Sequence, residues 1–157
     1  MSAADSYIHS SDSLINEQNS GHPVSAAVAL KTIEIMKSEH IVKRVGEDIG
    51  PYFQQSLRET LLDHPLVGHI EGVGLIAGIA LMLDPASKKA FPEDVDIGLI
   101  CRDHCFNNGL IMRAVGSRMV LSPPLVISHS EIDELCQKAR ECFDLTLQSV
   151  SDLGILL

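Results

Sequence analysis

Apolar residues recur at helical spacing along three parts of the chain, and each part predicts a helix. The first begins at Pro23, since proline is favoured at the first helical position, and continues through "VSAAVALKTIEIMK". The second is predicted from about residue 38 to residue 63, with a local kink at Pro51. Its apolar face consists of Ile41, Val45, Ile49, Phe53, Leu57 and Leu61. The last begins at a capping box of Ser128 and Glu131. Its apolar stripe consists of Ile132, Leu135, Cys136, Ala139, Phe143 and Leu147.

Between the second and the last helix, shorter apolar runs predict β-strands. The run "VGHIEGVGLIAGIALML" predicts two strands that turn at Glu71 and Gly72. A helix over "EDVDIGLICRDHCFNNG" is predicted to close at Asn108 and Gly109. The runs "LIMRAV" and "RMVLSPPL" predict two more strands, the second stopped by proline. The resulting order, α-α-β-β-α-β-β-α, indicates an α+β fold with a short, mainly antiparallel sheet covered by helices.

Length and composition fit one domain with an aliphatic core. The chain has 157 residues, of which 45% are hydrophobic and only 4% aromatic, and it contains no Trp. A chain of this size can bury a single core. Residues 1–18 are rich in Ser, Asp and Asn and are predicted to form a flexible tail. We therefore expect the folded domain to span residues 19–157.

The acidic balance of charge argues against several classes of partner. The net charge is −9, whereas nucleic acids and anionic membranes attract basic surfaces, so we expect neither as a partner. The longest apolar run, residues 73–83, is shorter than the roughly 20 residues of a membrane-spanning helix. No Lys or Arg precedes Lys31, and we recognise no targeting segment. These features predict a soluble, cytoplasmic protein.

The remaining side chains do not form a pattern typical of a catalytic or metal site. Cys101 and Cys105 would share one helix face beside His104, but zinc sites usually have tighter paired spacings. We expect no metal, and cysteines that act as small apolar side chains. The glycines of "EGVGLIAG" are not followed at once by a helix, as a phosphate-binding loop requires, so close approach of a helix explains them better. We identify no catalytic residue.

Arg113 is the exception, because it lies on a predicted strand that is otherwise apolar. A buried guanidinium without a partner is very costly, so this side chain needs one. One interpretation is a salt bridge to one of the acidic residues of the same chain. The other is a site that binds a substrate carboxylate through two hydrogen bonds, for which arginine is better suited than lysine.

Four segments of the chain carry a resemblance in combination: "SGHPVSAAVAL", "HPLVGHIEGVGLIAGIAL", "NNGLIMRAVGSRMVLSPPLVIS" and "EIDEL". In combination they resemble the C-terminal part of class III pyridoxal-phosphate-dependent aminotransferases, most closely the ω-amino acid or amine:pyruvate branch. The resemblance covers roughly residues 20–150. It implies the small C-terminal domain of fold-type I aminotransferases. It also implies transfer of an amino group from an amine or ω-amino acid to a 2-oxo acid such as pyruvate.

The resemblance implies roles for particular residues. Arg113 matches the family's arginine that grips the substrate carboxylate and swings aside for amine substrates. Pro123 and Pro124 match the segment that closes over the site. Two positions depart from the family: Gln18 stands where a threonine contacts the cofactor phosphate of the partner subunit. Ser117 stands where an acidic residue is common.

The family's Schiff-base lysine lies upstream of the SGHP turn, whereas no lysine precedes Lys31 here. We therefore expect neither transaminase turnover nor pyridoxal phosphate binding from this chain alone. We expect a homo-oligomer or a partner aminotransferase chain that supplies the large domain, with residues 23–37 packed against another chain. The alternative is a non-catalytic binding or interaction module, or a split-enzyme subunit, that reuses the fold. A free-standing amino-acid sensor would require Arg113 to line a closed pocket.

Overall fold

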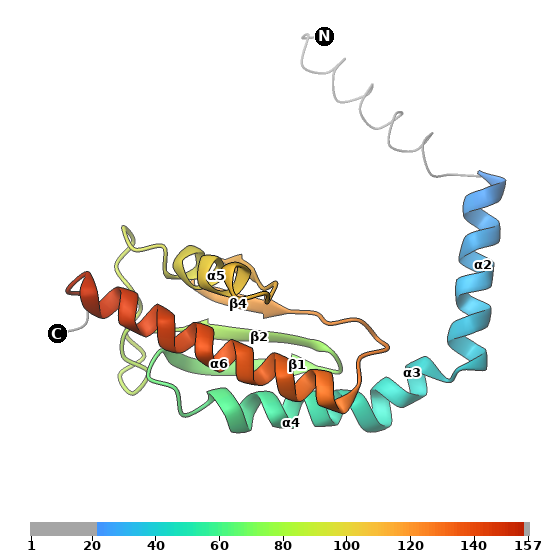
Figure 1. Cartoon of the computed structure of the whole chain (residues 1–157), viewed down its shortest axis with the longest axis horizontal. Helices are drawn as coiled ribbons and strands as arrows, with labels where there is room; N and C mark the ends of the chain where they lie inside the picture. The colour runs from blue at the N-terminus through green and yellow to red at the C-terminus, as the bar shows by residue number, and fades with distance from the viewer. Residues whose placement is uncertain (1–21, 156–157) are drawn as a thin grey trace, which may run out of the picture. The chain divides into compact units, whose positions relative to one another are not determined.

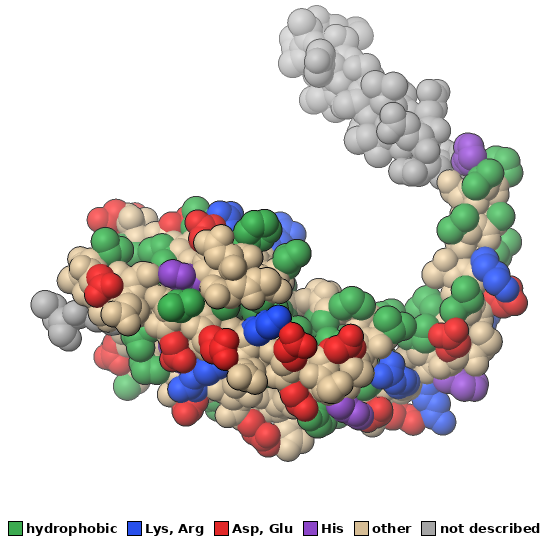
Figure 2. Space-filling view, viewed as in Figure 1, with side chains coloured by type: hydrophobic (Ala, Val, Ile, Leu, Met, Phe, Trp, Pro, Cys, Tyr) green, Lys and Arg blue, Asp and Glu red, His purple; other side chains and the backbone are tan. Residues whose placement is uncertain are grey.

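The computed structural model describes residues 22–155, and the chain divides after His40 into two compact units. The predicted tail, including Gln18, lies outside the described residues. The first unit contributes helix α2 (Pro23–Ser38), which begins at Pro23 as the sequence predicts (Figure 1). No residue of α2 is buried, and apolar side chains are exposed along its length (Figure 2).

The second unit is a four-stranded sheet with helices packed on one face (Figure 1). The strands are β1 (Val67–Val73), β2 (Ile76–Leu81), β3 (Arg113–Val115) and β4 (Arg118–Leu121). The helices are α3 (Ile41–Arg44), η1 (Val45–Ile49), α4 (Gly50–Leu61), α5 (Ile97–Asn107) and α6 (His129–Asp152). The strand order is β1-β2-β4-β3, and each neighbouring pair is antiparallel. The predicted α+β class and element order are therefore confirmed. Within residues 22–155, no helix has the length and apolar character needed to cross a bilayer.

The second predicted helix is divided into three helical segments around Pro51. Proline has no N–H to donate, so a regular α-helix through this position would lose one hydrogen bond. The π-helix η1 ends at Ile49, two residues before Pro51, and the Gly50 N–H donates to the Val45 carbonyl. The irregularity predicted at Pro51 is confirmed, and it takes the form of a π-helical turn. The predicted apolar face is also confirmed, with these residues buried: Ile41, Ile49, Phe53, Leu57 and Leu61.

The turn between β1 and β2 begins at Gly74, so the predicted turn at Glu71 and Gly72 is wrong. Val73 pairs with Ile76, which leaves only two residues for the turn. Gly74 has a φ of 57°, the left-handed conformation that such turns need and that glycine adopts without steric cost. Glu71 therefore lies within β1, where its side chain belongs to one face of the sheet.

The glycines around this turn allow α4 to approach the sheet closely. A Cβ atom on Gly72 would lie 2.8 Å from Gln54 Nε2, and one on Gly50 would lie 2.9 Å from the Gly74 Cα atom. The same Gln54 amide donates 3.1 Å hydrogen bonds to the carbonyl oxygens of Gly74 and Ile76. The interpretation of Gly72 and Gly74 as points of close approach of a helix is confirmed. For Gly78 it is wrong, because an added Cβ would meet only Glu71, no closer than 3.8 Å, and no residue of a helix.

Helix α5, the third predicted helix, begins later in the chain than the sequence predicts. It begins at Ile97 because the side chain of Asp96 caps it, accepting a 3.1 Å hydrogen bond from the Leu99 N–H. Its end is as predicted, since Gly109 has a φ of 75°.

Helix α6 completes the core and begins at the predicted capping box. Ser128 Oγ accepts from the Glu131 N–H at 3.3 Å, and a Glu131 carboxylate oxygen accepts from the Ser128 N–H at 2.8 Å. Its predicted apolar stripe packs inward, with these residues buried: Ile132, Cys136, Ala139 and Phe143. The two largest fully buried side chains are Phe53 of α4 and Phe143 of α6, so these helices share one core with the inner face of the sheet.

His64, which follows α4, is buried despite its place beside a turn. Its Nδ1 atom accepts a 3.1 Å hydrogen bond from the Leu66 N–H, so the neutral ring carries its proton on Nε2. That Nε2 atom lies 3.3 Å from an Asp144 carboxylate oxygen, and the ring packs edge-on against Phe143. Burial, and then the nearby Arg140 guanidinium, lower the pKa of His64 from its usual value of 6.5.

The lowered pKa of His64 makes the stability of the domain depend on pH. Below about pH 6.5 the unfolded chain binds a proton at this residue while the folded chain does not, so the free energy of unfolding falls as pH falls. We expect a slope of up to about 1.4 kcal/mol per pH unit between about pH 6.5 and 5.5 in urea unfolding. His64→Gln should flatten this slope, whereas His69→Gln, at an exposed position, should leave it. An equal slope in both variants would contradict this role of His64.

Candidate carboxylate-binding site

The two faces of the sheet differ in what covers them. Ile70, Ile79 and Met119 pair in register on β1, β2 and β4, and all three are buried beneath the helices. Side chains alternate between faces along a strand, so the neighbouring register row points the other way. We call this second surface the open face; its strand residues include His69, Glu71, Gly78, Arg113, Val115, Arg118 and Val120.

Arg113 begins β3, the edge strand, and its side chain is exposed on the open face. Among the described residues it makes no hydrogen bond or ion pair. Every other arginine of the chain has a partner within hydrogen-bonding distance: Arg44, Arg58, Arg102, Arg118 and Arg140. The salt-bridge interpretation of Arg113 is therefore wrong for the described part of the chain. Exposure removes the need for an internal partner, and it leaves all five N–H donors available to a ligand.

Arg118, on the neighbouring strand β4, is held by Glu71 of β1. The two side chains form an ion pair that bridges over β2 at Gly78, where no side chain intervenes. The second oxygen of Glu71 lies 3.8 Å from His69 Nε2. The sequence prediction missed this pair, because it placed Glu71 in a turn. Recognising Gly74 as the turn glycine would have put Glu71 on the same sheet face as Arg118.

The hairpin that carries Arg113 is fixed from both sides. Its two-residue turn begins at Gly116, with a φ of 55°, and the Leu81 N–H donates a 2.8 Å hydrogen bond to the Ser117 carbonyl. On the other side Gly98 of α5 lies so close that an added Cβ would collide with the Gly116 carbonyl oxygen. Ser117, at the position where the family commonly has an acid, is exposed. It places no carboxylate beside Arg113.

The proline segment after β4 runs along the surface toward α6. Pro123 is half-buried and Pro124 is exposed. The Ile127 N–H donates to the Pro124 carbonyl at 3.1 Å, and Arg44 donates to the Ile127 carbonyl at 2.9 Å. These bonds anchor the end of the segment to α3. Whether the segment closes over a substrate stays a prediction.

The exposure of Arg113 leads to a prediction about stability. Arg113→Ala removes no internal hydrogen bond or ion pair among the described residues, so we expect the free energy of unfolding to change by less than about 1 kcal/mol. Urea denaturation of the two proteins at neutral pH measures this change. A loss of several kcal/mol would instead show that the guanidinium is an internal structural partner.

The cysteines lie inside the helical layer, as expected of small apolar side chains. Burial raises the pKa of Cys142 to about 12 and that of Cys136 to about 11, while the hydrogen bond with Cys101 raises the pKa of Cys105 further. Thiols with such pKa values stay protonated and are poor nucleophiles or metal ligands. Within residues 22–155, no three His, Cys, Asp or Glu side chains are grouped so that they could hold a metal ion.

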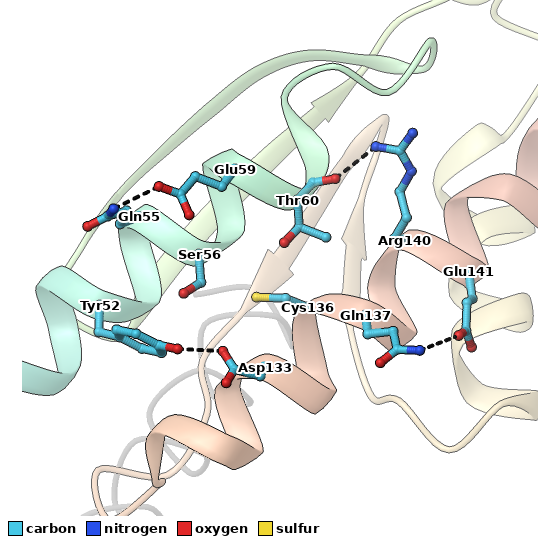
Figure 3. Close-up of a pocket in the computed structure, with 10 residues that line it drawn as sticks. All are labelled: Tyr52, Gln55, Ser56, Glu59, Thr60, Asp133, Cys136, Gln137, Arg140 and Glu141. Atoms are coloured by element: carbon cyan, nitrogen blue, oxygen red, sulfur yellow. Dashed lines mark hydrogen bonds between the residues drawn. The ribbon is translucent and has the colours of Figure 1, made fainter.

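A polar groove of about 550 Å³ lies between α4 and α6, in the helical layer (Figure 3). Its polar side chains bond mainly to one another. The Tyr52 hydroxyl donates to Asp133 at 2.6 Å, and this hydrogen bond raises the pKa of Tyr52. Arg140 donates to the Thr60 carbonyl at 2.8 Å. The groove therefore joins α4 to α6, and its tyrosine, glutamine and arginine donors are already engaged.

The described residues do not fit a complete pyridoxal phosphate site. The six lysines of the chain are Lys31, Lys37, Lys43, Lys88, Lys89 and Lys138. Lys31 and Lys37 lie on α2 in the first unit. The other four lie on α3, in the loop after β2 and on α6, so none of them lies on a strand of the open face. The residue matched to the cofactor-phosphate contact, Gln18, lies outside the described part. What this domain offers on the open face is the exposed guanidinium of Arg113.

Comparisons with known proteins identify the family of the chain. The family model described as "Aminotransferase class-III" matches residues 17–143. The chain is 50% identical over 131 residues to the putrescine–pyruvate aminotransferase of Pseudomonas aeruginosa, covering 83% of this chain and 28% of that protein. It is 37% identical over 134 residues to gamma aminobutyrate transaminase 3 of Solanum lycopersicum, covering 85% of this chain and 25% of that protein.

Solved structures share the fold of this chain over a similar part of its length. The ω transaminase of Pseudomonas jessenii, in complex with PMP, superimposes with a TM-score of 0.76 at 32% identity, covering 83% of this chain and 28% of that one. A transaminase from directed evolution by ancestral reconstruction superimposes with a TM-score of 0.78 at 37% identity, covering 82% of this chain and 28% of that one. The chain thus spans about a quarter to a third of these relatives. The match to the family model, the sequence identity and the shared fold show that the chain belongs to the class-III aminotransferases.

Proposed function

We propose that this chain is the C-terminal domain of a pyridoxal-phosphate-dependent aminotransferase and that Arg113 binds the carboxylate of its 2-oxo acid substrate. The amino donor is an amine or an ω-amino acid, and the acceptor is pyruvate or a similar 2-oxo acid. The observation that carries this proposal is the unpaired, exposed Arg113 on the open face, in a chain whose other arginines all have partners. The names of the relatives refer to putrescine, pyruvate and gamma-aminobutyrate, and these compounds support the substrate class.

The chemistry available to Arg113 is recognition of charge and shape. Its planar guanidinium can donate two parallel N–H···O bonds to one carboxylate, which fixes the orientation of the bound acid as well as its position. An exposed ion pair contributes little, so the site needs a second surface that excludes water from the open face. Pyridoxal phosphate, held by a large domain, supplies the electron sink for amino-group transfer.

The exposed position of Arg113 also favours some of the alternative functions of the chain over others. Because the side chain is exposed, it offers no support for a free-standing amino-acid sensor, which would enclose its ligand. A domain that completes its site with another surface suits a part of an aminotransferase or a split-enzyme subunit. A non-catalytic module remains the alternative, and the same experiment separates the two.

A chimaeric enzyme tests the proposed function. The matched part of the Pseudomonas aeruginosa putrescine–pyruvate aminotransferase is replaced by the corresponding residues of this chain, which are 50% identical. We expect the purified chimaera to transfer the amino group of putrescine to pyruvate. A folded chimaera that binds pyridoxal phosphate but shows no transfer would contradict the proposal and favour the non-catalytic module.

We also propose that α2 packs against another chain, most simply a second copy. Four of its apolar side chains are between 48% and 69% exposed: Val24, Val28, Leu30 and Ile33. A helix with apolar side chains spread around its circumference is normally buried on more than one side. Light scattering over a dilution series should show a dimer that dissociates on dilution, and Leu30→Glu should favour the monomer. Leu62→Glu, at an exposed leucine outside α2, is the control. A monomer at every concentration would reject this packing.

A further inference from the structure

The open face carries a second arginine whose charge is already engaged. Arg118 pairs with Glu71, and both side chains are more than half exposed. A surface ion pair of this kind contributes little to stability. Its position on the open face can instead affect which ligands bind there. Glu71 is the one acidic residue on the four strands in the described part of the chain, and Arg118 neutralises it.

The pair lies close to Arg113 in the sheet register. Glu71, Gly78, Val120 and Arg113 form one row across the four strands. With about 4.8 Å between strands, the ends of this row are about 14 Å apart. Arg118 is the diagonal neighbour of Arg113 on the same face, and such diagonals measure about 7 to 8 Å.

Gly78 allows Glu71 to reach Arg118. A Cβ atom added to Gly78 would lie 3.8 Å from Glu71 Cγ, so the glutamate side chain lies over this glycine on its way to β4. A larger side chain at this position would occupy the space that the pair uses. The Glu71 carboxylate therefore lies over β2 and toward Arg118.

We propose that Glu71 is a specificity-determining residue. By engaging Arg118 it leaves Arg113 as the free guanidinium of the open face among the described residues, and so favours monocarboxylates over dicarboxylates. The second carboxylate of a dicarboxylate meets a neutral ion pair, where it gains no cation and approaches the negative charge of Glu71. This inference rests on the proposed carboxylate-binding role of Arg113.

Glu71→Gln removes the negative charge and releases Arg118 while keeping a side chain of similar size. Two guanidinium groups at diagonal positions can then contact the two carboxylates of one short diacid. We expect the variant to bind dicarboxylates more tightly relative to monocarboxylates. His69, whose Nε2 atom lies 3.8 Å from Glu71, also loses this neighbour in the variant.

The test follows the arginine side-chain resonances of the 157-residue chain during titration with butyrate or glutarate at constant ionic strength. In the natural chain the Arg113 resonances should respond to both acids while those of Arg118 stay fixed. In Glu71→Gln, both arginines should respond to glutarate, and the ratio of glutarate to butyrate affinity should rise about fivefold, the effect of one added exposed ion pair. Gly78→Val, which displaces Glu71 sterically, should raise the same ratio.

Two control variants separate the role of the Glu71–Arg118 pair from a general effect of charge. Glu59→Gln, on α4 in the helical layer, changes the net charge equally and should leave the ratio unchanged. The double variant Glu71→Gln/Arg118→Gln should return it to the natural value. An Arg113 that responds to neither acid, in the 157-residue chain or in the chimaeric enzyme, contradicts the proposed function itself. An Arg113 that responds, with an unchanged ratio in both Glu71→Gln and Gly78→Val, overturns only the role of Glu71.

Discussion

Gly98→Ala is expected to destabilise the domain by about 1 to 3 kcal/mol, the usual cost of overpacking. Alanine is the better helix former, so helix propensity alone predicts the opposite sign. The structure decides the sign, because a Cβ on Gly98 would collide with the backbone carbonyl of Gly116 and lie 3.3 Å from the Cβ of Ala114. Backbone atoms in a paired hairpin cannot move aside as a flexible side chain could. The free energy of unfolding in urea measures the effect.

Gly46→Ala is the matched control for this prediction. Gly46 is also helical, but it is exposed, and an added Cβ would meet no atom within 4 Å. The substitution should be neutral, or stabilising by up to about 1 kcal/mol through helix propensity. Equal stabilities of the two variants would show that α5 does not press on the hairpin that carries Arg113.

Much of the fold could be predicted because its signals are local. The capping box at Ser128 and Glu131, and the left-handed Gly109 after α5, depend on residues within one turn of each other. The apolar stripes of α4 and α6 follow from periodicity alone. Their amphipathic faces also imply one shared core, which Phe53 and Phe143 occupy.

The parts that could not be predicted depend on contacts between distant residues. The ion pair of Glu71 and Arg118 joins residues 47 apart, and it depends on the register of three strands. The sequence around His64 predicts only a turn. The burial of the His64 side chain follows from packing against Phe143, which lies far along the chain. Arg113 was identified as a site residue, but its exposure follows from the position of β3 at the edge of the sheet. A one-residue difference in register would have reversed its face.

Arg113→Ala in the chimaeric enzyme is expected to lower kcat/KM for pyruvate by about 10- to 100-fold. A hydrogen-bonded charged pair contributes about 1.5 to 3 kcal/mol once the bound acid is shielded from water, and alanine removes all of it. The unfolding measurement on the same substitution should show little change, so a loss of folded protein would not explain the result. Lys138→Ala, which removes one positive charge from α6 on the helical side, should leave kcat/KM for pyruvate nearly unchanged. A similar loss in both variants would indicate a general effect of charge.

Separate rates for the two half-reactions of the chimaera test the role of Arg113 most directly. Putrescine carries no carboxylate, whereas pyruvate does, so only the second half-reaction needs the guanidinium. We expect Arg113→Ala to slow the reaction with pyruvate at subsaturating concentration by about 10- to 100-fold, and to leave the reaction with putrescine within about twofold of the unsubstituted chimaera. Equal losses in both half-reactions would contradict the account, because Arg113 would then support the whole site and not the substrate carboxylate.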